Sequence, residues 1–320
     1  MTIVQLQYVL SVAEHKNFTI AAEKSFVTQP TLSMQIQKLE NELNVDIFDR
    51  STHPITITSI GKKIIEQAKE IVTQTKRMES LVMEERKSMQ GNITLGLIPT
   101  ILPTILPLFY KNFKKKYPNL NLKIKELKTD LIIEKLNDGS LDFGIAVTPL
   151  SDNQIIEIPI FYEPMVAYIP PNHILHKETT IDEKLLNINT LLLLEEGHCF
   201  RNNVLSICNT QKIGHKNMDL DSGSFQTLIK LANEGFGMTI LPLLHTHDLN
   251  NNEKSNIRYF NSPVPTREIS LIHHQSQIRL SFANEFVELL QGIIRGMLYL
   301  ESNNITQPKI SLQKNNAIPT

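Results

Sequence analysis

The sequence has few of the features that cross-link a chain, anchor it in a membrane or export it. Only two cysteines occur in 320 residues, which excludes a disulfide framework and a four-cysteine zinc site. No apolar run approaches the roughly 18 residues of a transmembrane helix. The N-terminus lacks the basic and apolar regions of a secretory signal. We therefore expect a cytoplasmic protein without a membrane segment.

An excess of charge of either sign is also missing. Lys and Arg number 32 against 33 Asp and Glu, which gives a formal net charge of −1. This balance does not by itself indicate nucleic-acid binding, so such an assignment must rest on local motifs. Hydrophobic residues make up 41% of the chain, enough for sizeable cores. The length suggests two or three domains.

Motifs of common enzyme classes are absent as well. Residues 235–237 (Gly-Phe-Gly) are too short for a dinucleotide fingerprint, and neither a nucleophile elbow nor a Ser/His/Asp pattern occurs. The His and Asp residues at 245–248 are of ligand type, but no second cluster accompanies them. We therefore expect neither a metal site nor a cofactor.

The first sixty residues have the pattern of a winged helix-turn-helix. Apolar residues recur at helical spacing over 3–13, and a short second helix starts at Thr19. A third helix begins at Thr28, a candidate N-cap, with Pro30 in its first turn. Two strands over 45–49 and 55–58 form the wing. We assign residues 1–58 to this domain.

The third helix has a polar face opposite its apolar stripe. Gln, Ser, Thr and Lys can bond base edges or phosphates in the major groove, and a helix N-terminus favours phosphate. The predicted DNA contacts are Thr28, Gln29, Pro30, Thr31, Ser33, Met34, Gln37 and Lys38, with Arg50 and His53 from the wing. An ordinary solvated helix face is the alternative, because residues 1–62 carry five basic and six acidic groups.

Residues 59–90 predict a long polar helix with a narrow apolar stripe. Positions in the stripe alternate in steps of four and three, which is the spacing of a coiled-coil seam. The seam consists of Ile64, Ala68, Ile71, Thr75, Met78 and Val82. So narrow a stripe stabilises an isolated helix poorly, so we expect it to pair with a second copy. The alternative is a helix that lies on its own domain.

Residues 91–301 alternate between strand and helix patterns. This order predicts an α/β effector domain whose mostly parallel sheet is covered by helices. Two subdomains are expected, one of residues 91–162 with 268–301 and one of residues 163–267. Residues 302–320 lack periodicity and predict a loose tail. The predicted fold class is thus mixed: a winged helix-turn-helix, a linker helix and a two-part α/β domain.

The two cysteines stand nine residues apart in the effector domain. Gly197 precedes a predicted helix, so Cys199 lies near a helix N-terminus that favours a thiolate, beside His198 and Arg201. Two buried, inert thiols are the alternative. On one helix Cys199 and Cys208 would be roughly 13 Å apart, whereas a disulfide needs Cα atoms within about 7 Å. A bridge would therefore require the helix to melt or refold.

Two N-terminal segments carry a family resemblance. FTIAA at 18–22 and QPTLSMQIQKLE at 29–40 resemble the helix-turn-helix of the LysR-type transcriptional regulators, and the overall organisation is similar over residues 1–300. The resemblance implies an effector domain like periplasmic binding proteins. It also implies a homodimer joined through the linker helices, often a dimer of dimers. Such an assembly binds double-stranded operator DNA and signals to RNA polymerase.

Within that family the effector domain resembles the peroxide-sensing regulators. The similar segments are GLIPT at 96–100, EPM at 163–165, LLEEGHC at 193–199 and GMTILP at 237–242. The resemblance implies that hydrogen peroxide oxidises Cys199 and that Cys208 resolves it into a disulfide. It places Thr100, Thr129, His198 and Arg267 in the peroxide pocket. A thioredoxin- or glutaredoxin-type reductant would reset the switch.

The sequence therefore predicts a peroxide-responsive LysR-type transcription regulator and not an enzyme. One alternative is a regulator of the same type that binds a small organic effector, with both cysteines incidental. The other is a thiol peroxidase that turns over peroxide with Cys199. The winged helix-turn-helix and the linker helix argue against an enzyme, because neither would have a role in turnover.

Overall fold

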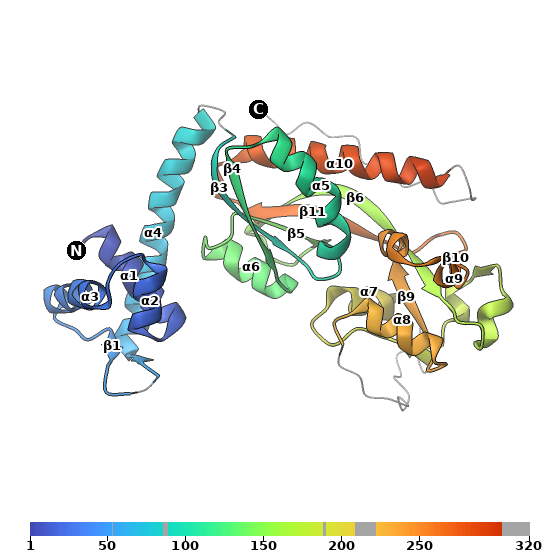
Figure 1. The fold of residues 1–320 in the computed structure, drawn as a ribbon, viewed down its shortest axis with the longest axis horizontal. Coiled ribbons are helices and arrows are strands. Elements are labelled where there is room, and N and C mark those ends of the chain that lie inside the picture. The colour runs from blue at the N-terminus through green and yellow to red at the C-terminus, as the bar shows by residue number, and fades with distance from the viewer. Residues whose placement is uncertain (53, 86–88, 188–189, 209–221, 303–320) are drawn as a thin grey trace. The chain divides into compact units, whose positions relative to one another are not determined.

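The computed structural model describes residues 1–52, 54–85, 89–187, 190–208 and 222–302, which divide near residue 88 into two compact units (Figure 1). Of the predicted features, His53 and residues 303–320 of the tail lie outside these ranges. Among the described residues, no helix combines the length and apolar character that a membrane span requires.

The N-terminal unit is the predicted winged helix-turn-helix. Its helices are α1 (Ile3–His15), α2 (Phe18–Lys24) and α3 (Gln29–Leu43), and the strands β1 (Phe48–Asp49) and β2 (Thr56–Ile57) pair antiparallel as the wing. The Thr28 side chain accepts a hydrogen bond from the backbone N–H of Thr31, which confirms Thr28 as the N-cap of α3. The buried face of α3 consists of Leu32, Ile36, Leu39 and Glu40.

The long helix α4 (Ser59–Glu85) has two apolar faces in place of the single seam that its sequence predicts. Ile65, Ala68 and Val72 are buried in the core of the N-terminal unit, so the alternative of a helix lying on its own domain holds for this face. Ala68 was assigned to the seam, and that assignment is wrong. The two stripes differ in phase by one position, which spacing alone does not resolve.

The second face of α4 remains exposed. Ile71, Met78 and Val82 are 40%, 68% and 47% exposed, and Ile64 and Thr75 are half-buried. Ile60 and Leu81 extend this face at 43% and 55% exposure. An apolar surface of this length on one helix is typical of an interaction site.

The buried carboxylate of Glu40 connects α3 to the wing. Its Oε1 accepts hydrogen bonds from the backbone N–H groups of Ile47, at 2.8 Å, and Phe48, at 3.2 Å. Its Oε2 lies 2.7 Å from Arg50 Nη2. The guanidinium of Arg50 also lies 5.0 Å from the centre of the Phe18 ring. One side chain therefore satisfies two backbone donors and one cation at the start of the wing.

In the C-terminal unit three strands follow the predicted parallel order. β3 (Gly91–Leu97) pairs parallel with β4 (Leu120–Glu126) and β5 (Phe143–Thr148). The helices α5 (Leu102–Lys116), α6 (Thr129–Asn137) and α10 (Leu280–Ser302) contribute to the core around these strands. Ser302, the first residue of the predicted tail, is the last residue of α10.

The rest of the sheet corrects the expectation of a mostly parallel arrangement. β6 (Ile155–Tyr168) runs antiparallel to β11 (Thr266–His274), β9 (Met238–Pro242) and β10 (Ile257–Phe260). A strand as long as β6 is hard to recognise in the sequence, because Pro159 and Pro164 interrupt the strand pattern. The structure accommodates Pro159 where the β6–β11 register shifts, opposite Ser270.

β6 contributes residues to two separate hydrophobic cores. The second core contains β9, α7 (Cys199–Ile207), α8 (Phe225–Asn233) and β8 (Leu191–Leu192), which pairs parallel with β9. A short strand, β7 (Thr180–Ile181), pairs with β10 at the far edge. The remaining elements are η1 (Ile174–Lys177), η2 (Glu183–Leu185), η4 (Leu243–Asp248) and α9 (Asn251–Lys254). The predicted mixed fold with a two-part α/β domain is confirmed.

Removal of the Glu40 carboxylate is expected to loosen the wing. Glu40→Ala leaves two buried N–H groups and a partly exposed cation without their acceptor, which costs about 3 kcal/mol. Hydrogen exchange at the amides of Ile47 and Phe48 in the full chain measures the loss of opening free energy at the wing. Glu14→Ala, at an exposed position of α1, is the matched control and should change this opening free energy by less than about 0.5 kcal/mol. Unchanged exchange in Glu40→Ala would contradict the assignment.

Candidate functional site

The two cysteines lie at opposite ends of α7, and the predicted position of Cys199 at a helix N-terminus is confirmed. Cys199 is its first residue, half-buried, and it packs against the first core. Cys208 follows the last residue of the helix and is buried in the second core. Both thiols are free in this conformation. Burial, with a smaller contribution from Glu183, raises the pKa of the Cys208 thiol above its usual value.

The segment before α7 is fixed by charged groups. Nε2 of the buried His198 lies 3.3 Å from Glu195 Oε1, and Lys128 Nζ lies 2.9 Å from the same oxygen. Lys128, and to a smaller extent His198, lowers the pKa of Glu195. Arg201 Nη1 donates to the backbone oxygen of Leu194 at 2.9 Å. The sequence places Arg201 beside the thiol, but in the structure its guanidinium holds the preceding loop.

A buried ion pair lies under the second residue of α7. Arg267 Nε and Nη2 donate to Glu163 Oε2 at 2.9 and 2.7 Å, and both side chains are almost fully buried. Arg267 Nη1 also donates to Thr100 Oγ1 at 3.1 Å. The Phe200 ring lies over the guanidinium, and the ring centre is 5.0 Å from Cζ of Arg267. The remaining Glu163 oxygen accepts from the backbone N–H of Leu244 at 3.1 Å.

Two buried polar atoms of the described site residues have no hydrogen-bond partner. They are Oγ1 of Thr129, the first residue of α6, and Oδ1 of Asn203, one helical turn after Cys199. An unsatisfied buried group of this kind costs roughly 1–3 kcal/mol unless a small polar molecule binds it. Thr129 Oγ1 thus joins neither the Arg267 pair nor the His198 pair.

The four site residues predicted from the sequence are not all joined by direct hydrogen bonds. Thr100 and Arg267 are directly bonded, His198 lies against Glu195 in the Lys128–Glu195 group, and the hydroxyl group of Thr129, the residue after Lys128, has no hydrogen-bond partner. Sequence reasoning missed Glu163, Phe200 and Asn203. Glu163 stands within the quoted EPM segment, but its partner is 104 residues away. Asn203 could have been found from its position one turn after Cys199 on the same helix.

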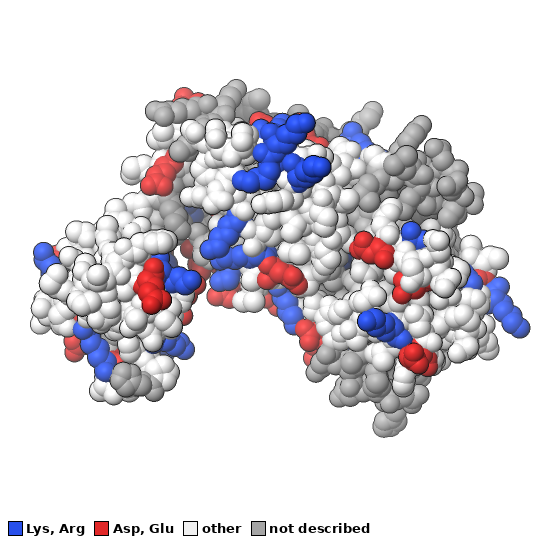
Figure 2. Space-filling model, in the orientation of Figure 1, with Lys and Arg blue, Asp and Glu red and all other residues white. Residues whose placement is uncertain are grey.

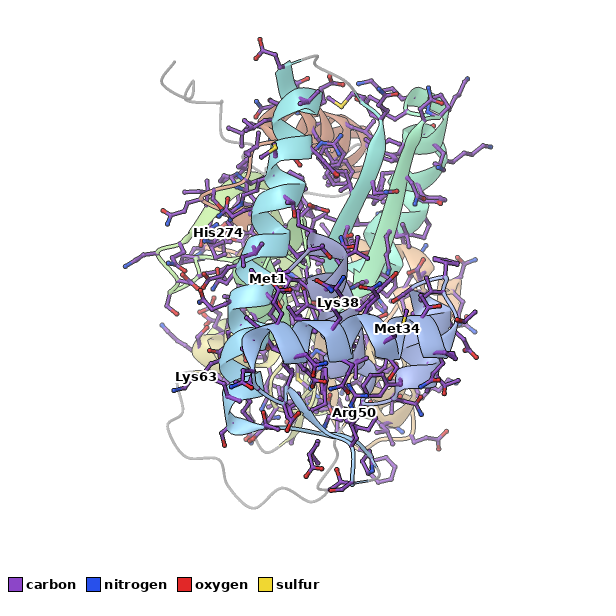
Figure 3. All side chains as sticks on the ribbon, turned by 90° about the vertical axis from the view of Figure 1, so that its left-hand side faces the viewer. Met1, Met34, Lys38, Arg50, Lys63 and His274 are labelled. Carbon is purple, nitrogen blue, oxygen red and sulfur yellow. The ribbon has the colours of Figure 1, made fainter. Side chains whose placement is uncertain are left out.

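Most of the predicted DNA contacts are exposed on or before α3. Thr28, Gln29, Pro30, Thr31, Met34, Gln37 and Lys38 are exposed, and Ser33 is half-buried. Figure 3 shows Met34 and Lys38 along α3, with Arg50 beside the wing. Arg50 is exposed as well, and its guanidinium is bound to Glu40 and donates to Ser33 Oγ at 3.2 Å. It therefore fixes the wing to the helix.

Comparison with known protein families accounts for both units. Residues 3–62 match the bacterial regulatory helix-turn-helix protein, lysR family, and residues 86–293 match the LysR substrate binding domain. The chain belongs to the LysR family. The family consists of transcription regulators, so the interpretation as a regulator is confirmed over that as a thiol peroxidase.

The similar proteins of this family include hydrogen peroxide-inducible genes activators. That of Haemophilus influenzae is 32% identical over 275 residues, which cover 85% of this chain and 90% of its own. Full-length mutant OxyR from Pseudomonas aeruginosa superposes with a TM-score of 0.72 at 32% identity, over 92% of this chain and 95% of its own. An H2O2-bound mutant OxyR from Corynebacterium glutamicum gives a TM-score of 0.65 at 27% identity, over 99% of this chain and 98% of its own.

The different surroundings of the two thiols predict a fixed order of alkylation. Cys208 is buried and its raised pKa leaves less thiolate at pH 8, so iodoacetamide should modify half-buried Cys199 at least tenfold faster, as an order-of-magnitude expectation. Peptide mass spectrometry of the native, reduced protein measures both rates. In urea the two rates should converge, because burial is lost. Faster native modification of Cys208 would contradict this order.

Proposed function

We propose that this LysR-family chain is a transcription regulator that responds to hydrogen peroxide through its two cysteines. The observation that carries the proposal is the placement of Cys199 and Cys208 at opposite ends of the nine-residue helix α7. The similar proteins named for hydrogen peroxide support the same function. In this proposal oxidation of Cys199 is the signal, and a Cys199–Cys208 disulfide is the state that alters DNA binding.

The oxidation has two steps, formation of a sulfenic acid at Cys199 and its condensation with Cys208. The Cys199 thiolate attacks one peroxide oxygen, the O–O bond breaks, and the released hydroxide takes up a proton as water, which leaves a sulfenic acid. The Cys208 sulfur then attacks the sulfenic sulfur, and the hydroxyl group leaves as a second molecule of water. Peroxide is reduced, and the two thiols are oxidised to the disulfide.

The pocket in this proposal is lined by Thr100, Thr129, His198 and Arg267, and we propose Asn203 as a fifth member because its buried Oδ1 has no hydrogen-bond partner. Hydrogen peroxide is small and both donates and accepts hydrogen bonds, so the unpartnered Thr129 hydroxyl and Asn203 carbonyl suit it. The cation of Arg267 and the N-terminus of α7 favour negative charge on the departing oxygen and on the thiolate.

A disulfide requires α7 to break. On the intact helix the two Cα atoms are about 13 Å apart, and they must come within about 7 Å. The rearrangement would remove Phe200 from the Arg267 guanidinium and Val204 from the second core. Oxidation is thereby coupled to the packing between the two halves of the effector domain.

We propose one role for each part of the chain. Residues 1–58 bind operator DNA through the exposed face of α3. The exposed face of α4, within residues 59–90, pairs with a second copy of the chain, and a substitution at Ile71 tests this pairing below. Residues 91–301 are the sensor. RNA polymerase is the partner in transcription, a thioredoxin- or glutaredoxin-type protein is the reductant, and promoter binding implies a cytoplasmic location.

A second candidate has its own support. The match of residues 86–293 to a substrate binding domain favours a small organic effector, with both thiols incidental. The two functions differ in whether Cys199 is required. The cysteine variants below therefore decide between them.

Serine substitutions should separate the two oxidation steps. Cys199→Ser is expected to abolish the change in operator footprint under stoichiometric peroxide, while DNA binding without peroxide stays unchanged, because the attacking sulfur is lost. Cys208→Ser should form a sulfenic acid that a dimedone reagent traps, but no disulfide. Thiol-trapping gels and footprinting measure both results.

The wild-type protein serves as the reference for these variants. It should gain one intramolecular disulfide, and hydrogen exchange across residues 200–208 should rise as α7 rearranges. A footprint change that persists in Cys199→Ser would overturn the peroxide switch and favour the small-effector function.

A charge on the exposed face of α4 should break the assembly. Ile71→Asp places an unpaired carboxylate in the proposed seam, and desolvation of this charge should weaken association by about 3 kcal/mol or more per interface. The side chain is exposed in the single chain, so folding should be unaffected. Analytical ultracentrifugation measures the oligomer, with Lys62→Asp at another exposed α4 position as the control. An unchanged oligomer in Ile71→Asp would show that this face does not pair.

A further inference from the structure

A lysine-rich stretch of the effector domain ends at Lys128, which contacts the segment that leads into α7. Seven lysines fall between residues 111 and 128, with Glu126 as the single acidic residue in that stretch. Figure 2 shows Lys and Arg side chains gathered over α5 and β4, which precede Lys128. Lys128 itself is half-buried and lies between β4 and α6, immediately before the first residue of α6. Its position makes it part of the first half of the effector domain.

The Lys128 ammonium group reaches the second half of this domain at two points. It lies 2.9 Å from Glu195 Oε1 and donates to the backbone oxygen of Glu196 at 3.4 Å. Gly197, which follows, adopts φ +84°, and a Cβ at that position would lie 3.5 Å from Lys128 Nζ. The cation therefore lies against the two residues that immediately precede His198 and Cys199.

Glu195 contacts the buried His198 as well as Lys128. The same oxygen that binds Lys128 lies 3.3 Å from His198 Nε2, and the backbone N–H of Glu195 donates to Ser222 at 2.9 Å. The Lys128 cation lowers the pKa of Glu195, so the group is a carboxylate at neutral pH. A carboxylate accepts only, so His198 must carry its proton on Nε2. In the neutral ring Nδ1 is then an acceptor.

We propose that Lys128 and Glu195 are positioning residues for the oxidation of Cys199. Lys128 fixes the Glu195 carboxylate from the opposite half of the domain, and Glu195 fixes the tautomer and orientation of the His198 ring. This inference rests on the proposed peroxide chemistry of Cys199 and adds to it two residues outside the pocket.

The exposure of the pair determines how large its effect can be. The Lys128 and Glu195 side chains are 41% and 30% exposed. Ion pairs of this exposure contribute little and are screened by salt, so loss of the cation should slow oxidation about two- to fivefold. The same loss should appear in the parent protein when the salt concentration is raised.

The experiment measures the first oxidation step alone. In the Cys208→Ser background, sulfenic acid formation at Cys199 by hydrogen peroxide is followed by rapid quench and mass spectrometry. Lys128→Met should react about two- to fivefold more slowly at 0.05 M NaCl, whereas Lys128→Arg should react at nearly the parent rate. Lys123→Met, an exposed lysine of β4, is the matched control and should react at the parent rate. Raising NaCl to 0.5 M should slow the parent but not Lys128→Met.

A spectroscopic signature tests the positioning through Glu195. Nitrogen-15 NMR of the imidazole groups, with His198 assigned from its substitution by Gln, should show the Nε2–H form in the parent. Glu195→Gln removes the carboxylate acceptor and should mix the two tautomers of His198. A tautomer ratio that does not move in Glu195→Gln would overturn the role of Glu195.

The remaining outcomes separate this inference from the proposed function. If the wild-type protein forms the disulfide but Lys128→Met reacts at the parent rate, the inference fails and the proposed function stands. If Lys123→Met is slowed as much as Lys128→Met, the effect is a general field of the lysine-rich stretch and the inference also fails. If the wild-type protein forms no disulfide, the proposed function itself fails.

Discussion

The guanidinium group of Arg267 is a charge in the interior, and the effector domain is arranged around its neutralisation. Removing water from such a cation costs several kcal/mol, which only a partner of good geometry offsets. Glu163 supplies two hydrogen bonds to Arg267, and Thr100 supplies its hydroxyl group and its backbone oxygen. These groups come from β11, β6 and the segment after β3. The ion pair therefore fixes the segment after β3, which belongs to the first core, against β11 and β6, and β6 continues into the second core.

The same ion pair determines where α7 can lie. An isolated nine-residue helix is unstable in water, so its stability comes from the groups against which it packs. Phe200 covers the guanidinium face of Arg267 and contacts the Phe225 ring of α8 edge to face, while Arg201 binds the carbonyl of Leu194. A helix held by a few specific contacts can exchange for another arrangement when a covalent bond offsets their loss. This is a two-state element of the kind that switching requires.

Local signals in the sequence determine the helices well and the site only in part. The N-cap Thr28 and the apolar stripe of α3 follow from neighbouring residues, and the structure confirms both. By contrast, Pro159 and Pro164 conceal most of β6, because a proline in a strand is tolerated only where the pairing allows it. Glu163 was missed because its role depends on Arg267, distant in sequence. Ala68 was misplaced because two apolar stripes on α4 are one residue out of phase.

In the proposed function the two ends of α7 give the two thiols different tasks before any peroxide arrives. Cys199 is half-buried at the positive end of the helix, so it can react while α7 is intact. Cys208 is buried, and the same burial that raises its pKa separates it from solvent. It becomes a nucleophile only when the helix opens, since opening both exposes it and lowers its pKa toward the usual value. In the proposed switch the chemical step therefore precedes the conformational step, and the second thiol stays out of reach of other oxidants until peroxide has reacted with the first.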